Sequence, residues 1–195
     1  MIPYYENLIK TVRDAVASID EARYGELLDQ CETALKSGHK IIASGLGKNV
    51  PICEKFVGTM NSFGLEASFL HTNSAIHGDL GIVKKGDLVI LLSKSGNTSE
   101  TITLADYLRD RGSNTWSFSF NQAGKVNGIA SHALVMKLDN EGDLWNVAPN
   151  NSTTVFLIVL QGIAIELSRR MGVTIEDFKM NHPGGAIGQQ LKDIK

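Results

Sequence analysis

The sequence predicts an α/β protein whose parallel five-stranded sheet is covered by helices on both faces. Short β-rich runs alternate with longer amphipathic segments from about residue 38 onward. This alternation is typical of βαβ units, because parallel neighbouring strands need a crossover of helical length. The chain has 195 residues, of which 43% are hydrophobic, which is enough for one domain with a full core.

A helical arm is predicted ahead of the first strand. Apolar residues recur at helical spacing between positions 4 and 36, and Gly38 ends the pattern. We expect residues 1–37 to form this N-terminal arm as part of the same domain, and residues 38–195 to form the α/β portion. The apolar stripe of the arm must be covered by the sheet, by its own second helix or by another subunit.

The remaining elements follow from the hydrophobic pattern. Strands are predicted at 40–44, 67–70, 88–93, 115–120 and 133–138, and helices at about 49–62, 98–111, 124–130 and 152–171. The apolar stretch from Val155 to Leu167 is interrupted by polar residues and is shorter than the roughly 20 residues that span a bilayer. We therefore expect a buried helix there, and no membrane segment.

Composition excludes several classes of function. The net charge is −2 and no basic cluster is present, which argues against nucleic-acid and anionic-membrane binding. The N-terminus lacks a basic region followed by an apolar run, so we expect no secretory signal and a cytoplasmic location. Cys31 and Cys53 have no CxxC spacing and are expected to be reduced core thiols. No compact His/Cys/carboxylate cluster has ligand spacing, so no metal is expected.

A hydroxyl-rich turn follows the third predicted strand, where ligands of parallel sheets bind. Residues 93–100 read Ser-Lys-Ser-Gly-Asn-Thr-Ser-Glu and lead into a helix. Backbone N–H groups, the hydroxyls of Ser93, Ser95, Thr98 and Ser99 and a helix dipole would converge there, which suits a phosphate. The alternative is a simple helix start, with Asn97 as N-cap and Glu100 as its capping-box partner.

Two further helix starts carry features that suit an anion. Gly45-Leu46-Gly47-Lys48 follows the first strand, where glycine admits close backbone approach and the lysine adds a cation. It is neither a dinucleotide fingerprint nor a Walker A loop, because Val50 and Asn49 break those patterns. Ser152-Thr153-Thr154 forms a second cluster of small polar residues at the start of the last long helix.

Acid/base candidates lie near the ends of predicted elements. His77 precedes Gly78 and Asp79, Glu141 precedes the second polar cluster, and His182 precedes a glycine turn that would aim its ring. Taken alone, His77 or Glu141 is more simply explained as an ordinary loop residue. Together with the lysine and the phosphate-suited turns, they form the set that sugar-phosphate acid/base chemistry needs.

Five motifs together resemble the sugar isomerase (SIS) domain, most closely that of the D-arabinose 5-phosphate isomerases. The resemblance covers roughly residues 38–191, with the motifs in the correct order. The motifs are Gly45-Leu46-Gly47-Lys48, Ala75-Ile76-His77-Gly78-Asp79-Leu80-Gly81, residues 93–100, Ala148-Pro149 with Ser152-Thr153-Thr154, and Glu176-Asp177-Phe178 with His182-Pro183-Gly184-Gly185-Ala186-Ile187-Gly188.

The resemblance implies a flavodoxin-like three-layer fold and a homo-oligomer, a tetramer or dimer of dimers, that interconverts aldose and ketose phosphates without a metal or organic cofactor. The histidines of that family can reach a site across a subunit boundary. The implied catalytic residues are Glu141, His182, Glu100, Lys48 and His77. The implied phosphate contacts are Ser93, Ser95, Thr98 and Ser99, to which the helix starts add Gly47, Ser152 and Thr153.

Several positions depart from the family pattern, so the sequence leaves the sugar open. Asn49 and Val50 replace serine and glycine, Asn97 replaces a common glutamate, and residues 142–145 replace a cysteine-proline pair. Many relatives continue into a pair of CBS domains where this sequence stops, so a regulatory module is expected to be missing or removed.

The expected reaction moves a proton between neighbouring carbons through an enediol, which needs a base near both carbons. Glu141 is favoured over Glu100 as this base. His182 would assist ring opening, and His77 would position a hydroxyl or relay a proton. Lys48 would stabilise negative charge on the substrate. The alternatives are another isomerase such as a 6-phospho-3-hexuloisomerase, a non-catalytic sugar-phosphate sensor, or an assembly scaffold.

Overall fold

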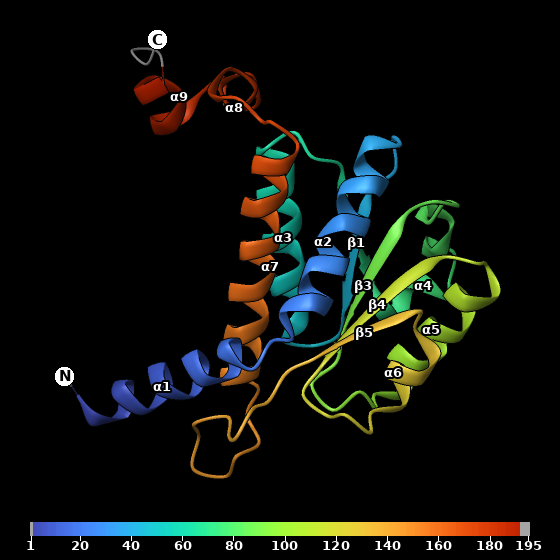
Figure 1. Cartoon of the computed structure of the whole chain (residues 1–195), viewed down its shortest axis with the longest axis vertical. Helices are drawn as coiled ribbons and strands as arrows, with labels where there is room; N and C mark the ends of the chain where they lie inside the picture. The colour runs from blue at the N-terminus through green and yellow to red at the C-terminus, as the bar shows by residue number, and fades with distance from the viewer. Residues whose placement is uncertain (1, 192–195) are drawn as a thin grey trace.

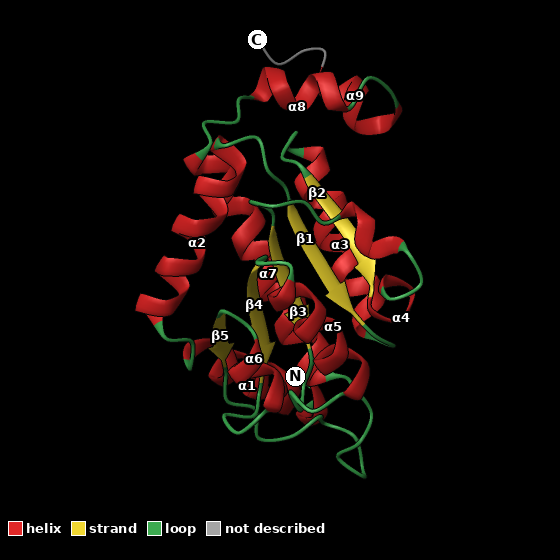
Figure 2. Cartoon of the chain, turned by 90° about the vertical axis from the view of Figure 1, so that its right-hand side faces the viewer, coloured by secondary structure: helices red, strands yellow, loops and turns green. Residues whose placement is uncertain are grey.

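The computed structural model describes residues 2–191 and contains a five-stranded parallel sheet with the order β2-β1-β3-β4-β5 (Figures 1 and 2). The strands are β1 (Ile41–Gly45), β2 (Ala67–His71), β3 (Leu88–Leu92), β4 (Asn114–Ser119) and β5 (His132–Val135). This order is that of flavodoxin-like sheets, whose strand order reverses between β1 and β3. The predicted α/β class and parallel sheet are confirmed.

Helices cover both faces of the sheet. They are α1 (Pro3–Ala17), α2 (Glu21–Lys36), α3 (Asn49–Ser62), α4 (Thr72–Ala75), the 3₁₀ turn η1 (Asp79–Ile82), α5 (Ser99–Asp110), α6 (Lys125–Ile129), α7 (Asn151–Arg170), α8 (Ile175–Asn181) and α9 (Gly185–Leu191). One face carries α2, α3 and α7, with α1 against α7, and the other carries α4, η1, α5 and α6 (Figure 1).

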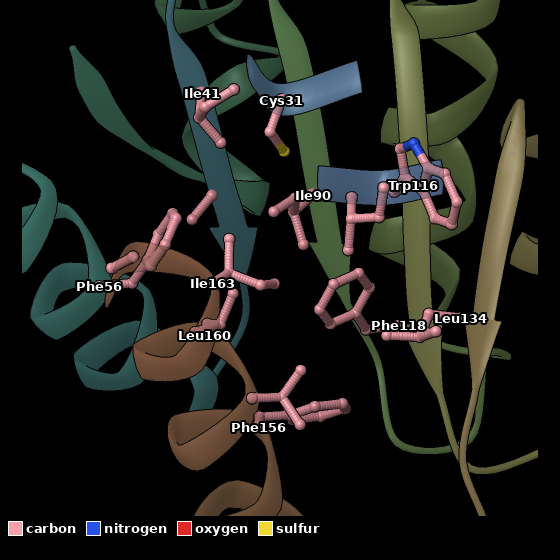
Figure 3. Packing of buried hydrophobic residues seen from close by; sticks show 14 of the residues in the cluster. Cys31, Ile41, Phe56, Ile90, Trp116, Phe118, Leu134, Phe156, Leu160 and Ile163 are labelled. Atoms are coloured by element: carbon pink, nitrogen blue, oxygen red, sulfur yellow. The ribbon is translucent and has the colours of Figure 1, made fainter. Parts of the chain in front are cut away.

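The alternation of side chains along each strand divides the core into two clusters. In β3, Leu88, Ile90 and Leu92 belong to the cluster shared with α2, α3 and α7, whereas Val89 and Leu91 belong to the one shared with α5 and α6. Figure 3 shows the larger cluster, in which side chains of the sheet pack against those of α2, α3 and α7. Burial on both faces explains why the strands read as continuous apolar runs.

The N-terminal arm consists of two helices, and the apolar stripe of α2 is covered within the chain. Leu27, Leu28 and Cys31 of α2 are buried against the sheet and α7. Helix α1 contributes Ala15 but leaves large side chains such as Tyr4 and Tyr5 half exposed.

Most boundaries lie within one or two residues of the predicted ones, but the last strand is shorter than predicted. The apolar run to Leu138 suggested a longer strand, yet β5 ends at Val135. The N–H of Met136 still donates to Ser119, whereas that of Lys137 donates to the Ser18 hydroxyl at 2.8 Å. The chain therefore leaves the sheet to contact the helical arm, an interaction that no local pattern indicates.

Helix α7 is long and apolar enough to cross a membrane by length and composition alone. Half of its most apolar window is buried inside the protein, and core helices pass the same test. Val155, Phe156, Leu160 and Ile163 belong to the larger core cluster, as expected for a buried helix.

Helices α8 and α9 lie beyond the end of the sheet opposite to that of α1 and the loop before α7 (Figures 1 and 2). Asn181 of α8 donates to the carbonyl of Ser62, the last residue of α3, at 3.3 Å. Phe178 packs against Phe63 with ring centroids 5.9 Å apart. These contacts anchor α8 at the amino-terminal end of the sheet, because α3 runs antiparallel to the strands.

Candidate functional site

A cleft of about 710 Å³ lies at the carboxyl ends of β1 and β3, where the strand order reverses. Its walls come from the segment before α3, the turn after β3, the first turn of α5 and the start of α7. Six of the predicted site residues line it, namely Gly47, Lys48, Ser93, Ser95, Thr98 and Ser152. The fold thus brings together the segments around Lys48, Ser93 and Ser152, which the sequence indicated as three separate candidates.

A second groove of about 720 Å³ runs along α2 near the amino-terminal ends of the strands. Its lining includes Glu26, Asp29 and His39 but no part of the hydroxyl-rich turn. Ligands of parallel sheets bind beyond the carboxyl ends of strands, so the first cleft is the candidate site.

The turn after β3 is held rigidly by its neighbour after β4. The N–H of Phe120 donates to the carbonyl of Lys94, and the side-chain amide of Asn121 donates to the carbonyl of Ser95, both at 2.9 Å. Gly96 has a positive φ of 64°, a conformation that favours glycine. The hydroxyls of Ser93 and Thr98 lie 3.1 Å apart at the cleft.

Helix α5 begins without the predicted capping box. Its N-cap is Thr98, which makes no side-chain cap hydrogen bond. The side chain of Asn97 instead accepts from the N–H of Lys125 at 3.1 Å, and Glu100 accepts from the Ser99 hydroxyl at 2.8 Å. The interpretation with Asn97 as N-cap is therefore wrong, because Asn97 bridges to the first residue of α6. Because the N-cap side chain makes no cap hydrogen bond, N–H groups of the first turn are available for an anion.

Lys48 stands at the N-cap of α3 and is exposed in the cleft. The preceding glycines allow this placement: Gly47 has a φ of 59°, and a Cβ on Gly45 would lie 2.7 Å from the Cβ of Asn49. A substitution at Gly45 would thus push α3 away from the sheet. The structure confirms that this glycine turn brings a lysine to a helix start.

Glu141 is fully buried beside the cleft. Its Oε2 accepts from the N–H groups of Ser152 at 2.9 Å and Asn150 at 3.1 Å, at the start of α7. Its Oε1 lies 2.8 Å from Nζ of Lys94 in an ion pair, off hydrogen-bond geometry. Burial raises the pKa of Glu141, but the Lys94 ammonium and the two N–H groups lower it by more, so the pKa lies below its ordinary value.

Lys94 and Thr101 are among the cleft residues to which the sequence assigned no role. Lys94 lines the cleft with a side chain that is 43% exposed. Thr101 also lines it, is 2% exposed, and has a buried hydroxyl with no hydrogen-bond partner. Helical spacing could have indicated Thr101, since it lies three residues after Thr98 and shares its helix face. Nothing in the sequence pairs Lys94 with Glu141.

Besides the buried Glu141, four further predicted residues lie outside the lining of the cleft. Ser99 donates to Glu100, which is exposed on the first turn of α5. The Thr153 hydroxyl donates to the carbonyl of Asn150 at 2.9 Å. His77 is exposed in the segment between α4 and η1.

His182 is the sixth predicted residue that does not line the cleft, and it lies at the other end of α3. Its Nδ1 donates to the carbonyl of Phe178 at 2.8 Å, and its ring stacks on the Phe178 ring at 4.1 Å. Lys48 begins the 14-residue α3, whereas α8 is anchored at its last residue. A helix of that length spans about 21 Å, so His182 cannot reach the cleft of its own chain.

The described part of the chain holds no group of three or more His, Cys, Asp or Glu side chains that could bind a metal ion. The two cysteines are free and buried, in line with the expectation of core thiols. The polar groups of the cleft itself are hydroxyls, backbone N–H groups and ammonium groups, which suit an anion rather than a cation.

Known proteins are similar to this chain over most of its length. Residues 34–166 match the family model described as the SIS domain. Arabinose 5-phosphate isomerase KdsD of Pseudomonas aeruginosa is 36% identical over 180 residues, which are 92% of this chain and 55% of the relative. KdsD of Escherichia coli K12 is 32% identical over 179 residues, again 92% and 55%. This chain therefore spans about half the length of these curated relatives.

A solved structure is similar over nearly its whole length. The protein c3406 of E. coli CFT073, in complex with arabinose 5-phosphate, superposes with a TM-score of 0.86 at 30% identity. The match covers 92% of this chain and 94% of that one.

Proposed function

Because the chain belongs to the SIS domain family, we propose that it is an aldose-ketose isomerase that interconverts D-arabinose 5-phosphate and D-ribulose 5-phosphate through an enediol. The observation that carries this proposal is the cleft itself, where a phosphate-suited turn, Lys48 and a buried carboxylate meet. KdsD relatives are named as arabinose 5-phosphate isomerases, and c3406 was solved with arabinose 5-phosphate. We further propose that the protein acts in the cytoplasm.

The phosphate of the substrate would bind at the turn after β3. Ser93, Ser95 and Thr98 offer hydroxyls, and the uncapped start of α5 offers N–H groups and a positive dipole end. Ser152 at the start of α7 and the backbone of Gly47 complete the pocket. The unpartnered Thr101 hydroxyl supports this placement, because a buried donor without a partner is costly unless a ligand satisfies it.

Glu141 would be the base that moves the proton between C1 and C2. Its lowered pKa keeps it ionised at neutral pH, the form that accepts a proton. Its Oε2 is fixed by two N–H groups, so Oε1 is the oxygen left for chemistry. Glu100, the other candidate, is exposed and does not line the cleft. Its carboxylate accepts from the Ser99 hydroxyl instead.

The remaining roles need a second copy of the chain. His182 would assist ring opening and His77 would position a hydroxyl or relay a proton, yet neither lines the cleft. The separation of His182 from Lys48 along α3 supports a site completed by a neighbouring protomer in a homo-oligomer, a tetramer or a dimer of dimers. Lys48, inside the cleft, would stabilise negative charge on the substrate.

A sugar-phosphate sensor is the alternative from another class. The full burial of Glu141 behind Lys94 favours it, because a binding protein needs no accessible base. An isomerase for another sugar, such as a 6-phospho-3-hexuloisomerase, would use the same cleft.

Incubation in D₂O with arabinose 5-phosphate, followed by phosphorus and proton NMR, tests these proposals. Isomerisation produces a new phosphate resonance and deuterium at the exchanging carbon. Binding without exchange for arabinose 5-phosphate and a panel of ketose phosphates would contradict the isomerase and support the sensor. In the active protein, Glu141→Gln should abolish exchange while the ligand still binds; unchanged exchange would exclude Glu141 as the base.

A further inference from the structure

Lys94 lies between the proposed phosphate-binding turn and the proposed catalytic base, Glu141. It belongs to the turn that would bind phosphate, and its ammonium lies 2.8 Å from Glu141 Oε1. Its own carbonyl is tied to the N–H of Phe120, so the main chain is fixed to the neighbouring loop. Its side chain has room to move, since it is 43% exposed at the cleft.

The two oxygens of Glu141 have different environments. Oε2 accepts from Asn150 and Ser152 and is thereby anchored to α7. Oε1 accepts no hydrogen bond from the described residues, and the Lys94 ammonium stands against it. Because the Glu141 side chain has no exposed surface, a substrate reaches Oε1 only after this ammonium has moved.

We propose that Lys94 is a positioning residue that couples phosphate binding in the cleft to exposure of the Glu141 carboxylate. In the ligand-free protein the ammonium covers Oε1, and in the complex it turns toward the substrate phosphate bound by the neighbouring hydroxyls. This inference rests on the proposed function, since it assigns the uncovered carboxylate to proton transfer.

Charge supplies the driving force for this movement. An ammonium has three donors, and the single carboxylate oxygen beside Lys94 does not satisfy them all. A sugar phosphate carries up to two negative charges and competes effectively for the cation. A ligand can shift such an equilibrium only through differential affinity, which here is the added ion pair with phosphate.

Departure of the ammonium would also change the chemistry of Glu141. A buried carboxylate that loses its cation becomes harder to ionise and therefore a stronger base. The Lys94 ammonium would thus keep the Glu141 carboxylate a weak base until a phosphate binds in the cleft. This arrangement favours proton transfer from a correctly seated substrate.

Calorimetric titration of the full chain with inorganic phosphate tests the proposal without requiring turnover. Lys94→Met should weaken phosphate binding about tenfold, which corresponds to about 1.4 kcal/mol, and Lys94→Arg should recover most of it. Glu141→Gln should act in the opposite direction and tighten binding several-fold, because it releases the ammonium. Lys84→Met removes an equal charge outside the cleft and should leave binding unchanged.

The pH dependence of turnover gives a second readout that a merely structural role would not move. In Lys94→Met the acidic limb of the kcat/KM profile, which reports the free enzyme, should shift to higher pH, and Lys94→Arg should restore it. Wild-type phosphate affinity in Lys94→Met, or unchanged or weaker binding in Glu141→Gln, overturns the coupling. A folded protein that binds phosphate as expected but isomerises no sugar contradicts the proposed reaction alone, so the two failures are distinguishable.

Discussion

The backbones of Gly96 and Gly124 are in direct contact: a Cβ placed on Gly96 would lie 2.8 Å from the Cα of Gly124. The carbonyl of Gly96 also accepts from the N–H of Val126 at 2.9 Å. The turn proposed to hold phosphate is therefore positioned by the loop after β4, and neither glycine leaves room for a side chain.

Gly96→Ala should lower the free energy of unfolding by about 1–3 kcal/mol, because it combines a clash with a positive φ. It should also weaken phosphate binding, since the turn must shift. Gly128→Ala in α6 is the matched control, because nothing lies within 4 Å of its Cβ. That change should be neutral or stabilising by up to about 1 kcal/mol in a urea titration. Equal stability of the two variants would contradict the packing argument.

Thr101→Val should weaken phosphate binding without destabilising the protein. The Thr101 hydroxyl is buried and unpartnered, so its loss should leave the free energy of unfolding unchanged or raise it by up to about 1 kcal/mol. Thr115→Val is the control: its hydroxyl accepts from the N–H of Ser131 at 2.9 Å, so stability should fall while phosphate affinity stays constant. Unaltered phosphate affinity in Thr101→Val would show that this hydroxyl does not contact the ligand.

Mixing two inactive variants should restore activity if His182 serves a neighbouring cleft. Lys48→Met and His182→Asn should each abolish turnover. Unfolding and refolding them together should regenerate up to about one quarter of wild-type activity, the share of intact sites after random pairing. Each variant refolded alone is the control. No recovery from mixed oligomers of normal size would argue that His182 acts outside the site.

Asp87 should make stability depend on pH. It is buried and accepts from Nζ of Lys40 and from the N–H of Lys84, both at 2.8 Å. Burial raises its pKa, but the Lys40 ammonium and the backbone N–H groups lower it by more, to below the ordinary value. Its contribution is therefore complete above the unfolded-state pKa of about 3.9 and is lost as pH falls through the lower folded-state value.

Asp87→Asn should accordingly cost about 3 kcal/mol at pH 7 and much less near pH 2, as measured by urea unfolding at each pH. Asp106→Asn, which breaks an exposed ion pair with Arg109, should cost less than about 1 kcal/mol. A constant difference between wild type and Asp87→Asn at all pH values would exclude the linkage.

Cys31 and Cys53 should be unreactive in the folded protein. Burial raises the pKa of each thiol to about 12, so almost no thiolate forms at pH 8. A chromogenic disulfide reagent should label neither residue until denaturant is added and both afterwards. Rapid labelling of the native protein would show that one of these helices opens.

Local patterns determined much of this protein. Buried parallel strands read as apolar runs, and helices read as amphipathic repeats, so the order of elements and the class of sheet could be predicted. The strand-end rule then identified the segments around Lys48, Ser93 and Ser152, because the ends of parallel strands converge whichever strands are neighbours. The capping of α5 was predicted wrongly because the Asn97 side chain accepts from the N–H of Lys125, the first residue of α6, 28 residues further along the chain.

Only the tertiary structure decided which side chains meet. Lys94 and Glu141 come from different loops, and their ion pair exists because β3 and the start of α7 border the same cleft. His182 shares no cleft with Lys48 because α8 is anchored at the far end of α3. The hydrophobic pattern of a segment shows which side of that helix or strand is buried. It does not show which other segments pack against that side, and the contacts of Lys94 and His182 depend on this packing.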